Sequence, residues 1–271
     1  MNPIQVTFDS NVWESLVDLE RLAAHPEAMS LGVVRKAIED GQISPYFSDT
    51  LITLEAIRKT ERADFLSGTR VTTTRTEVFE ESPTTGASAR ISLEIAADFS
   101  HHPGQHEILI PLLSKAIDLG FKFIGTSRVG WLRAPDGMYK PQESNNHLLG
   151  YRIDRTCNAG RAFSERGLGE AHLRRLGDEA KEGREELRFV SPFIAAGSHP
   201  DQRAVARAIA ELADGDALAA HYGHDHDVFC TLDFGRGAGR SSVLHIDHRA
   251  WLRAEFGMSI FTPSELAQHI S

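Results

Sequence analysis

The sequence predicts an α/β fold in which a parallel sheet is flanked by helices and carries an inserted α+β elaboration. Strand-like segments are followed by helical segments at both ends of the chain, the order typical of parallel sheets. Two strand-like segments, residues 4–8 and 228–232, run directly into Asp9 and Asp233. The middle of the chain, from about residue 60 to residue 198, does not keep this rhythm, which indicates an insertion.

Composition places the chain among ordinary globular proteins. Its 271 residues can bury a full core, and 41% of them are hydrophobic and 25% charged. The short apolar runs predict no membrane-spanning segment, and the N-terminus lacks a signal-peptide pattern. Cys157 and Cys230 are far apart, which favours free thiols and a cytoplasmic location. The net charge of −9 argues mildly against a nucleic-acid partner, although residues 151–175 hold six arginines and only three acidic residues.

The N-terminal elements follow from periodicity and capping. Residues 4–8 alternate apolar and polar side chains and predict a strand. Helical spacing covers 11–31, and a second helix over 32–40 ends at Gly41. A short extended piece then precedes a helix that starts at Ser48 or Asp49 and runs to Arg58.

The middle segment predicts a β-hairpin over 69–96, because two runs rich in β-branched residues flank a turn-like sequence. A helix over 109–119, a short strand within 120–126 and a long exposed loop over 127–146 follow. Residues 152–186 are strongly charged and mostly helical.

The C-terminal segment returns to the α/β pattern. We expect a helix over 200–212, a shorter one over 216–222 and a strand over 228–232. A final strand leads into a helix capped by Thr262 or Ser264.

Four acidic residues form the candidate site. Asp9 and Asp233 end parallel strands, so they should meet at the carboxyl edge of the sheet, where ligands bind. Glu55 lies between apolar helical positions and should point inward, towards either a cation or a buried Arg or Lys partner. Asp216 opens an Ala-rich helix, either as part of the site or as an N-cap, a role that Asp214 could take instead. Carboxylates gathered this way repel one another unless a hard cation such as Mg²⁺ or Mn²⁺ neutralises them, and such ions suit phosphodiester hydrolysis.

Four motifs in order resemble those of PIN-domain nucleases: "VTFDSNVW", "FSDTLITLEAI", "DGDALAA" and "VFCTLD", followed by the strand-to-helix ending "FGMSIFTPSELAQ". The resemblance implies a three-layer PIN-like fold with a catalytic core over 1–60 and 200–271. The intervening 61–199 is then an insertion that partly completes the core. This sequence departs from compact toxin-type members of the family, because its span between Glu55 and Asp216 is far longer.

The resemblance also implies a Mg²⁺- or Mn²⁺-dependent ribonuclease, with RNA as substrate and an antitoxin-like protein or a second copy as partner. Its catalytic, metal-binding acids would be Asp9, Glu55, Asp216 and Asp233, oriented by Asn11 and Thr231. The alternative is a catalytically silent PIN-like module that binds or scaffolds nucleic acid or protein.

Cationic and aromatic residues of the insertion are the candidates for contact with a single strand, or else structural parts of the insertion. They are Arg128, Trp131, Arg133, Lys140, Arg152, Arg155 and Arg161. His221, His224 and His226 are close in sequence, but a polar turn is favoured over a zinc site because Gly223 should end the helix. A haloacid-dehalogenase-type phosphatase is disfavoured because Asn11 stands where that family needs a second acid. No dinucleotide-binding glycine motif follows the first strand.

Overall fold

The structure, a computed structural model, describes residues 2–68, 70–82, 86–98, 104, 106–126, 137–142, 148–188, 190–235 and 239–270. The strands are β1 (Ile4–Phe8), β2 (Ile43–Ser48), β3 (Arg70–Ser82), β4 (Gly86–Asp98), β5 (Lys122–Ile124), β6 (Val228–Cys230) and β7 (Ile260–Phe261). The α-helices are α1 (Ser10–Val17), α2 (Leu19–Ala24), α3 (Ala28–Glu39), α4 (Arg62–Gly68), α5 (Leu109–Asp118), α6 (Leu149–Glu165), α7 (Glu170–Lys181), α8 (Pro192–Ala196), α9 (Gln202–Gly223), α10 (Ile246–Phe256) and α11 (Pro263–Ile270). Short 3₁₀ turns are η1 (Asp49–Ile52), η3 (Glu185–Leu187) and η4 (Gly239–Ser241).

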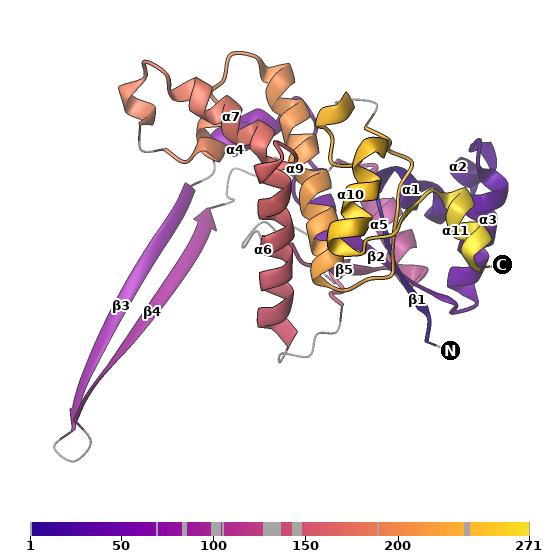
Figure 1. Cartoon of the computed structure of the whole chain (residues 1–271), viewed down its shortest axis with the longest axis horizontal. Coiled ribbons are helices and arrows are strands. Elements are labelled where there is room, and N and C mark those ends of the chain that lie inside the picture. The colour runs from indigo at the N-terminus through magenta and orange to yellow at the C-terminus, as the bar shows by residue number, and fades with distance from the viewer. Residues whose placement is uncertain are drawn as a thin grey trace.

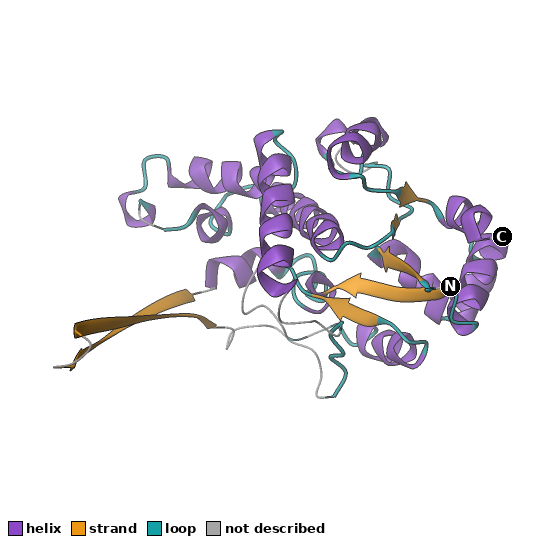
Figure 2. Ribbon diagram, turned by 60° about the horizontal axis from the view of Figure 1, so that its bottom comes forward, coloured by secondary structure: helices purple, strands orange, loops and turns teal. Residues whose placement is uncertain are grey.

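The predicted α/β fold with a parallel sheet flanked by helices is confirmed. Five strands lie in the order β5-β2-β1-β6-β7, and each neighbouring pair is parallel. Because all five run the same way, their carboxyl ends share one edge of the sheet (Figure 2). The edge strand β5 comes from the segment between residues 61 and 199.

Helices cover the sheet in two layers. On one face, Val6 and Phe8 pack into a core with residues of α1, α3, α5 and α11, including the fully buried Trp13. On the other face, α9 supplies Leu218, which clusters with Phe229 of β6. Helices α6 and α10 contribute to this second cluster, and a third core joins α4, α7 and α8 to the first half of α9.

The β-hairpin predicted over 69–96 is confirmed, as β3 and β4 cover residues 70–82 and 86–98. Strands β3 and β4 are antiparallel over their full length, from the pair Arg70 and Asp98 to the pair Ser82 and Gly86. Figures 1 and 2 show this two-stranded ribbon projecting away from the rest of the described chain.

The helix predicted over 11–31 is wrong, because the segment is divided between α1, α2 and the start of α3. Asp18 causes the first break: its carboxylate accepts hydrogen bonds from the backbone N–H groups of Glu20 and Arg21, at 3.1 Å each, and so starts a new helix. The following helix ends where it was predicted to, with Gly41 in the left-handed region at φ 71°.

The helix predicted to run to Arg58 is also wrong. The chain forms η1 over Asp49–Ile52 and then continues as turns. The side chain of Thr53 hydrogen-bonds back to the carbonyl of Asp49, a local contact that competes with a regular helix. Arg62 then donates to the carbonyl oxygens of Glu55 and Ile57, which fixes the turn beneath the site.

The two helices predicted over 200–212 and 216–222 are one continuous helix, α9. Gly215 sits inside it, although glycine costs a helix about 1 kcal/mol relative to alanine. The packing accounts for it, because a Cβ at Gly215 would lie 3.1 Å from the Cα of Gly169, just before α7. The two glycines therefore allow α7 to approach α9 closely.

The C-terminal prediction holds in its main parts. β6 ends at Cys230 rather than at Leu232, and the final strand and helix are present as β7 and α11. Thr262 caps α11 reciprocally: its hydroxyl accepts from the Glu265 N–H and its own N–H donates to the Glu265 carboxylate. Helix α10 was not predicted.

Most of the loop predicted over 127–146 lies outside the described residues. The described part hydrogen-bonds to β5, since the Phe123 N–H donates to the Lys140 carbonyl and the Gln142 N–H donates to the Phe123 carbonyl. Among the described residues, no helix is both long enough and apolar enough to cross a membrane.

Candidate acidic site

Asp9 is the centre of the candidate site. It follows β1 and caps α1, and its Oδ1 accepts from the Ser10 N–H at 2.7 Å. Its Oδ2 accepts from the Thr231 hydroxyl at 2.6 Å and from the Asn11 amide at 2.8 Å. Asp9 is only 8% exposed, so these bonds hold one buried carboxyl group in a fixed orientation.

Thr231 and Asn11 link Asp9 to the loop that carries Asp233. The Thr231 hydroxyl oxygen, which is fully buried, also accepts from the Asp233 N–H at 2.8 Å. The Asn11 side-chain oxygen accepts from the Leu232 N–H at 2.9 Å. The two predicted supporting residues therefore contact both the first acid and the segment of the last one.

Glu55 reaches the site from the turn after η1. The Ser10 hydroxyl lies 3.2 Å from Glu55 Oε1 and 3.4 Å from Asp9 Oδ1. One hydroxyl has a single proton and cannot donate to both carboxylates at once. The guanidinium of Arg62 binds backbone carbonyls, and its positive charge partly offsets the repulsion that Glu55 experiences.

The helical acid that faces this cluster is Asp214, whereas the sequence pointed to Asp216. Residues two apart on an α-helix are separated by about 200° around its axis, so only one of the two can face the cluster. The charges of Asp9, Glu55 and Asp233 all act on Asp214. Asp216 instead acts on Asp49, which follows β2.

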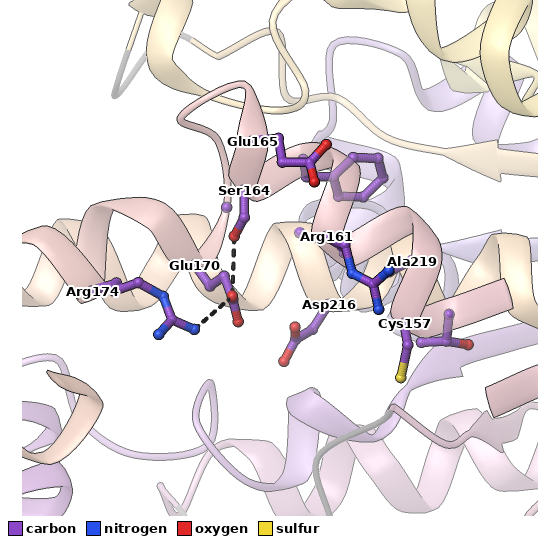
Figure 3. Close-up of a pocket in the computed structure, with 13 residues that line it drawn as sticks. Cys157, Arg161, Ser164, Glu165, Glu170, Arg174, Asp216 and Ala219 are labelled. Carbon is purple, nitrogen blue, oxygen red and sulfur yellow. Dashed lines mark hydrogen bonds and ion pairs between the residues drawn. The ribbon is translucent and has the colours of Figure 1, made fainter. Parts of the chain in front are cut away.

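Asp216 lines a separate cavity of about 640 Å³ between α6, α7 and α9. Figure 3 shows Asp216 on its wall, with Arg161 of α6 and Glu170 of α7 also lining it. Glu170 accepts from Ser164 at 3.0 Å and from Arg174 at 3.1 Å. The structure therefore does not bring the predicted third acid together with the other three.

Burial and mutual repulsion raise the pKa values in the acidic cluster. Burial raises the pKa of Asp9, and the charge of Asp233 raises it further. The pKa of Glu55 rises to about 7, first through burial and then through the charge of Asp9. Burial raises the pKa of Asp214 well above its ordinary value, and neighbouring acids add to the effect.

Glu211, one turn before Asp214 on α9, is a further acid that the sequence analysis missed. It is 8% exposed, and burial followed by the charge of Asp233 raises its pKa to about 7. Helical spacing could have found it, because residues three apart share a face. This spacing could be used only if residues 202–223 were recognised as one helix, whereas the predicted helices ended at residue 212 and began again at residue 216.

The donor chemistry of the cluster fits a hard divalent cation, since every side chain offers carboxylate oxygen. Among the described residues, no three His, Cys, Asp or Glu side chains lie close enough together to hold a metal ion as they stand. Metal binding would therefore have to draw the carboxyl groups closer together.

The predicted substrate-contacting residues are in different situations. Arg128, Trp131 and Arg133 lie outside the described residues, and Lys140 is exposed. Arg155 donates to the Tyr222 carbonyl, pairs with Asp225 at 3.0 Å and stacks on the Tyr222 ring. It therefore ties α6 to the end of α9.

Arg152 and Arg161 lie on α6 with Arg155. Arg161 lines the cavity that contains Asp216, and the positive charge of Arg152 acts on His224 and His226.

Helix α9 ends at Gly223 and a polar turn leads to β6, as predicted. His221, His224 and His226 form a hydrogen-bonded network there, in which His221 and His226 are buried. His221 Nδ1 and His226 Nδ1 lie 3.0 and 2.8 Å from the Thr7 hydroxyl, and His224 and His226 contact Gln142 Oε1 at 2.8 and 3.1 Å. Neutral rings satisfy every contact, if Thr7 donates to one histidine and accepts from the other. Burial lowers the pKa of His221 to about 3 and that of His224 to about 4. Elsewhere, His101 and His102 lie outside the described residues, and His106 Nδ1 accepts a hydrogen bond from the Ile108 N–H just before α5.

Comparisons with known proteins identify no relative of this chain. No family model matches the chain, and searches of curated proteins and of solved structures return no match. The resemblance to PIN-domain nucleases therefore stays a prediction from the motifs.

Proposed function

We propose that this protein is a nuclease that depends on Mg²⁺ or Mn²⁺ and cleaves RNA. The observation that carries the proposal is the convergence of acids from separate segments at the carboxyl edge of a parallel sheet. Asp9, Glu55, Asp214 and Asp233 are the proposed cation-binding residues, with Asp214 in place of the predicted Asp216. RNA as the substrate rests on the resemblance to PIN-domain nucleases.

In the proposed mechanism, the cation and the protein side chains have separate roles. When bound, the cation would activate water and stabilise the charge on the leaving oxygen. Thr231 and Asn11 orient the Asp9 carboxylate, and they lower the free-energy cost of its ionisation by donating hydrogen bonds. Buried acids that remain partly protonated near neutral pH would also give the site groups able to exchange protons with substrate or water.

The experiment is a cleavage assay on single-stranded RNA and DNA with Mn²⁺, using a matched pair of variants on one helix. Asp214→Asn should lower the cleavage rate by about 100-fold or more, equivalent to about 2.7 kcal/mol in the barrier. Asp216→Asn changes the same chemical group two residues away and should leave cleavage nearly unchanged. Asp9→Asn should behave like Asp214→Asn.

Two results would count against this assignment. If cleavage is lost in Asp216→Asn but kept in Asp214→Asn, then Asp216, the residue that the motif indicates, is the third cation-binding acid. A wild-type protein inert on both RNA and DNA with Mn²⁺, and with no divalent binding lost on Asp233→Asn, would support a silent binding or scaffolding module instead.

A further inference from the structure

A second cavity, of about 290 Å³, lies between α7 and α9 beside the 3₁₀ turn η4. Helix α7 contributes His172 and Arg175 to its lining, and α9 contributes Arg207 and Glu211. Ser241 of η4 completes this side, and its carbonyl oxygen lies 2.9 Å from His172 Nε2. The cavity therefore has positively charged walls on two helices.

The two arginines of this cavity are available to a ligand. Within the described ranges, neither the Arg175 nor the Arg207 guanidinium forms a hydrogen bond or a close ion pair, and the charge of Arg207 acts at longer range on Asp201. The neighbouring Arg174 differs, since it pairs with Glu170 at 3.1 Å. Because guanidinium groups match phosphate geometry with paired donors, two of them facing one cavity favour a phosphate group.

Glu211 connects this cavity to the acidic site. Glu211 is one of the residues that line the cavity, and its charge acts on Asp214 of the acidic cluster. Its carboxyl group hydrogen-bonds with the Ser242 side chain and the Val243 backbone, while its Oε2 is buried and has no hydrogen-bond partner among the described residues. Because Glu211 and Asp214 are three residues apart on α9, a ligand group in the cavity would lie about one helical turn from the acidic cluster.

We propose that the cavity formed by His172, Arg175, Arg207 and Glu211 binds a backbone phosphate of the single RNA strand, next to the position of cleavage. This inference rests on the proposed function for the identity of the strand. The volume is slightly below the range typical of sites that enclose a whole small molecule, about 300–1,000 Å³. A single phosphodiester of a longer chain suits that size better than a free nucleotide does. On a chain with a net charge of −9, such a site also gives phosphate a local positive region.

Binding of a fluorescently labelled single-stranded RNA, measured by anisotropy in EDTA, tests the inference without any cleavage. The double variant Arg175→Gln/Arg207→Gln should weaken binding by about 10-fold or more. It should also make the dependence of log K on log salt concentration shallower by about 0.7, the value for one lost phosphate contact on a single strand. The matched control is Arg188→Gln/Arg253→Gln, which removes the same charge from exposed arginines outside the cavity and should bind like wild type. Thermal melting checks that both double variants are folded.

The possible outcomes separate this inference from the nuclease proposal. Unchanged binding in Arg175→Gln/Arg207→Gln, equal losses in the control, or no RNA binding by wild type would each overturn it. AMP competing as strongly as the oligonucleotide would assign the cavity to free nucleotides and overturn it too. RNA binding that depends on both arginines, in a protein that never cleaves with Mn²⁺, would support this site and reject the nuclease.

Discussion

At the scale of single residues, the orientation of Asp9 depends on one buried hydroxyl. Thr231 donates to Asp9 Oδ2 at 2.6 Å while it accepts from the Asp233 N–H at 2.8 Å. The first bond lowers the pKa of Asp9 and so opposes the effect of burial. A hydroxyl that both donates and accepts at a fully buried position cannot be replaced by a methyl group without leaving partners unsatisfied.

We therefore predict that Thr231→Val, which preserves shape but removes the hydroxyl, raises the pKa of Asp9. The acidic limb of the pH–rate profile for RNA cleavage should move to higher pH, with a loss of about 10-fold near pH 7. Thr231→Ser keeps the hydroxyl and should retain the wild-type profile. A lower rate with an unshifted profile in Thr231→Val would contradict the assigned role.

The acidic residues of the site could be identified from the sequence where they follow a predicted strand. Asp9 and Asp233 could be predicted, because an acid within a few residues of the end of a parallel strand lies at the carboxyl edge of the sheet. Glu55 also reaches the site, although from a turn and not from the predicted helix. The choice between Asp214 and Asp216 could not be made, since a 200° difference in direction depends on the exact course of α9.

At the scale of elements, tertiary packing accounts for the wrong helix boundaries. The glycine at position 215 suggests the end of a helix, yet α9 continues through it. The glycine is accounted for by packing, because the chain just before α7 leaves no room for a side chain there. The turn over residues 53–58 has helical periodicity but is held by side-chain contacts to carbonyl groups. Neither cause is visible in local propensity.

Gly177 lies where α7 packs against α8, and we predict that its replacement by alanine has a large effect on stability. A Cβ at Gly177 of α7 would lie 1.8 Å from the carbonyl oxygen of Pro192, where α8 begins. Gly177→Ala must push α8 away and should lower the free energy of unfolding by about 1–3 kcal/mol or more, as overpacking does. Urea denaturation monitored by circular dichroism measures this change.

The matched control is Gly32→Ala in α3, where an added Cβ meets no atom within 4 Å. There alanine should raise the free energy of unfolding by about 0.5–1 kcal/mol, because glycine is the poorer helix former. Equal effects of the two substitutions would mean that α7 and α8 are not packed as described.

At the scale of the whole molecule, two clusters that each include residues of α9 respond to pH in opposite directions. The histidine network has lowered pKa values, so the unfolded chain binds more protons and stability is lost as pH falls below about 6.5. The acids have raised pKa values, so the folded chain binds more protons between about pH 4 and 7. Their contribution to stability is therefore lost as pH rises through that range.

A bound cation would act on the acids alone, because the histidines are neutral throughout the upper part of this range. Protons compete with the cation for the carboxylates, so Mn²⁺ should raise the melting temperature little at pH 5 and progressively more up to about pH 7.5, above the pKa of about 7 for the proposed ligand Glu55. Thermal melting with and without Mn²⁺ across this range measures the difference, in which the histidine contribution cancels. Asp214→Asn should reduce that difference, while Asp216→Asn should leave it unchanged. A shift of equal size at every pH would place the cation away from these acids, because only ligands that are protonated at pH 5 make its binding depend on pH in this window.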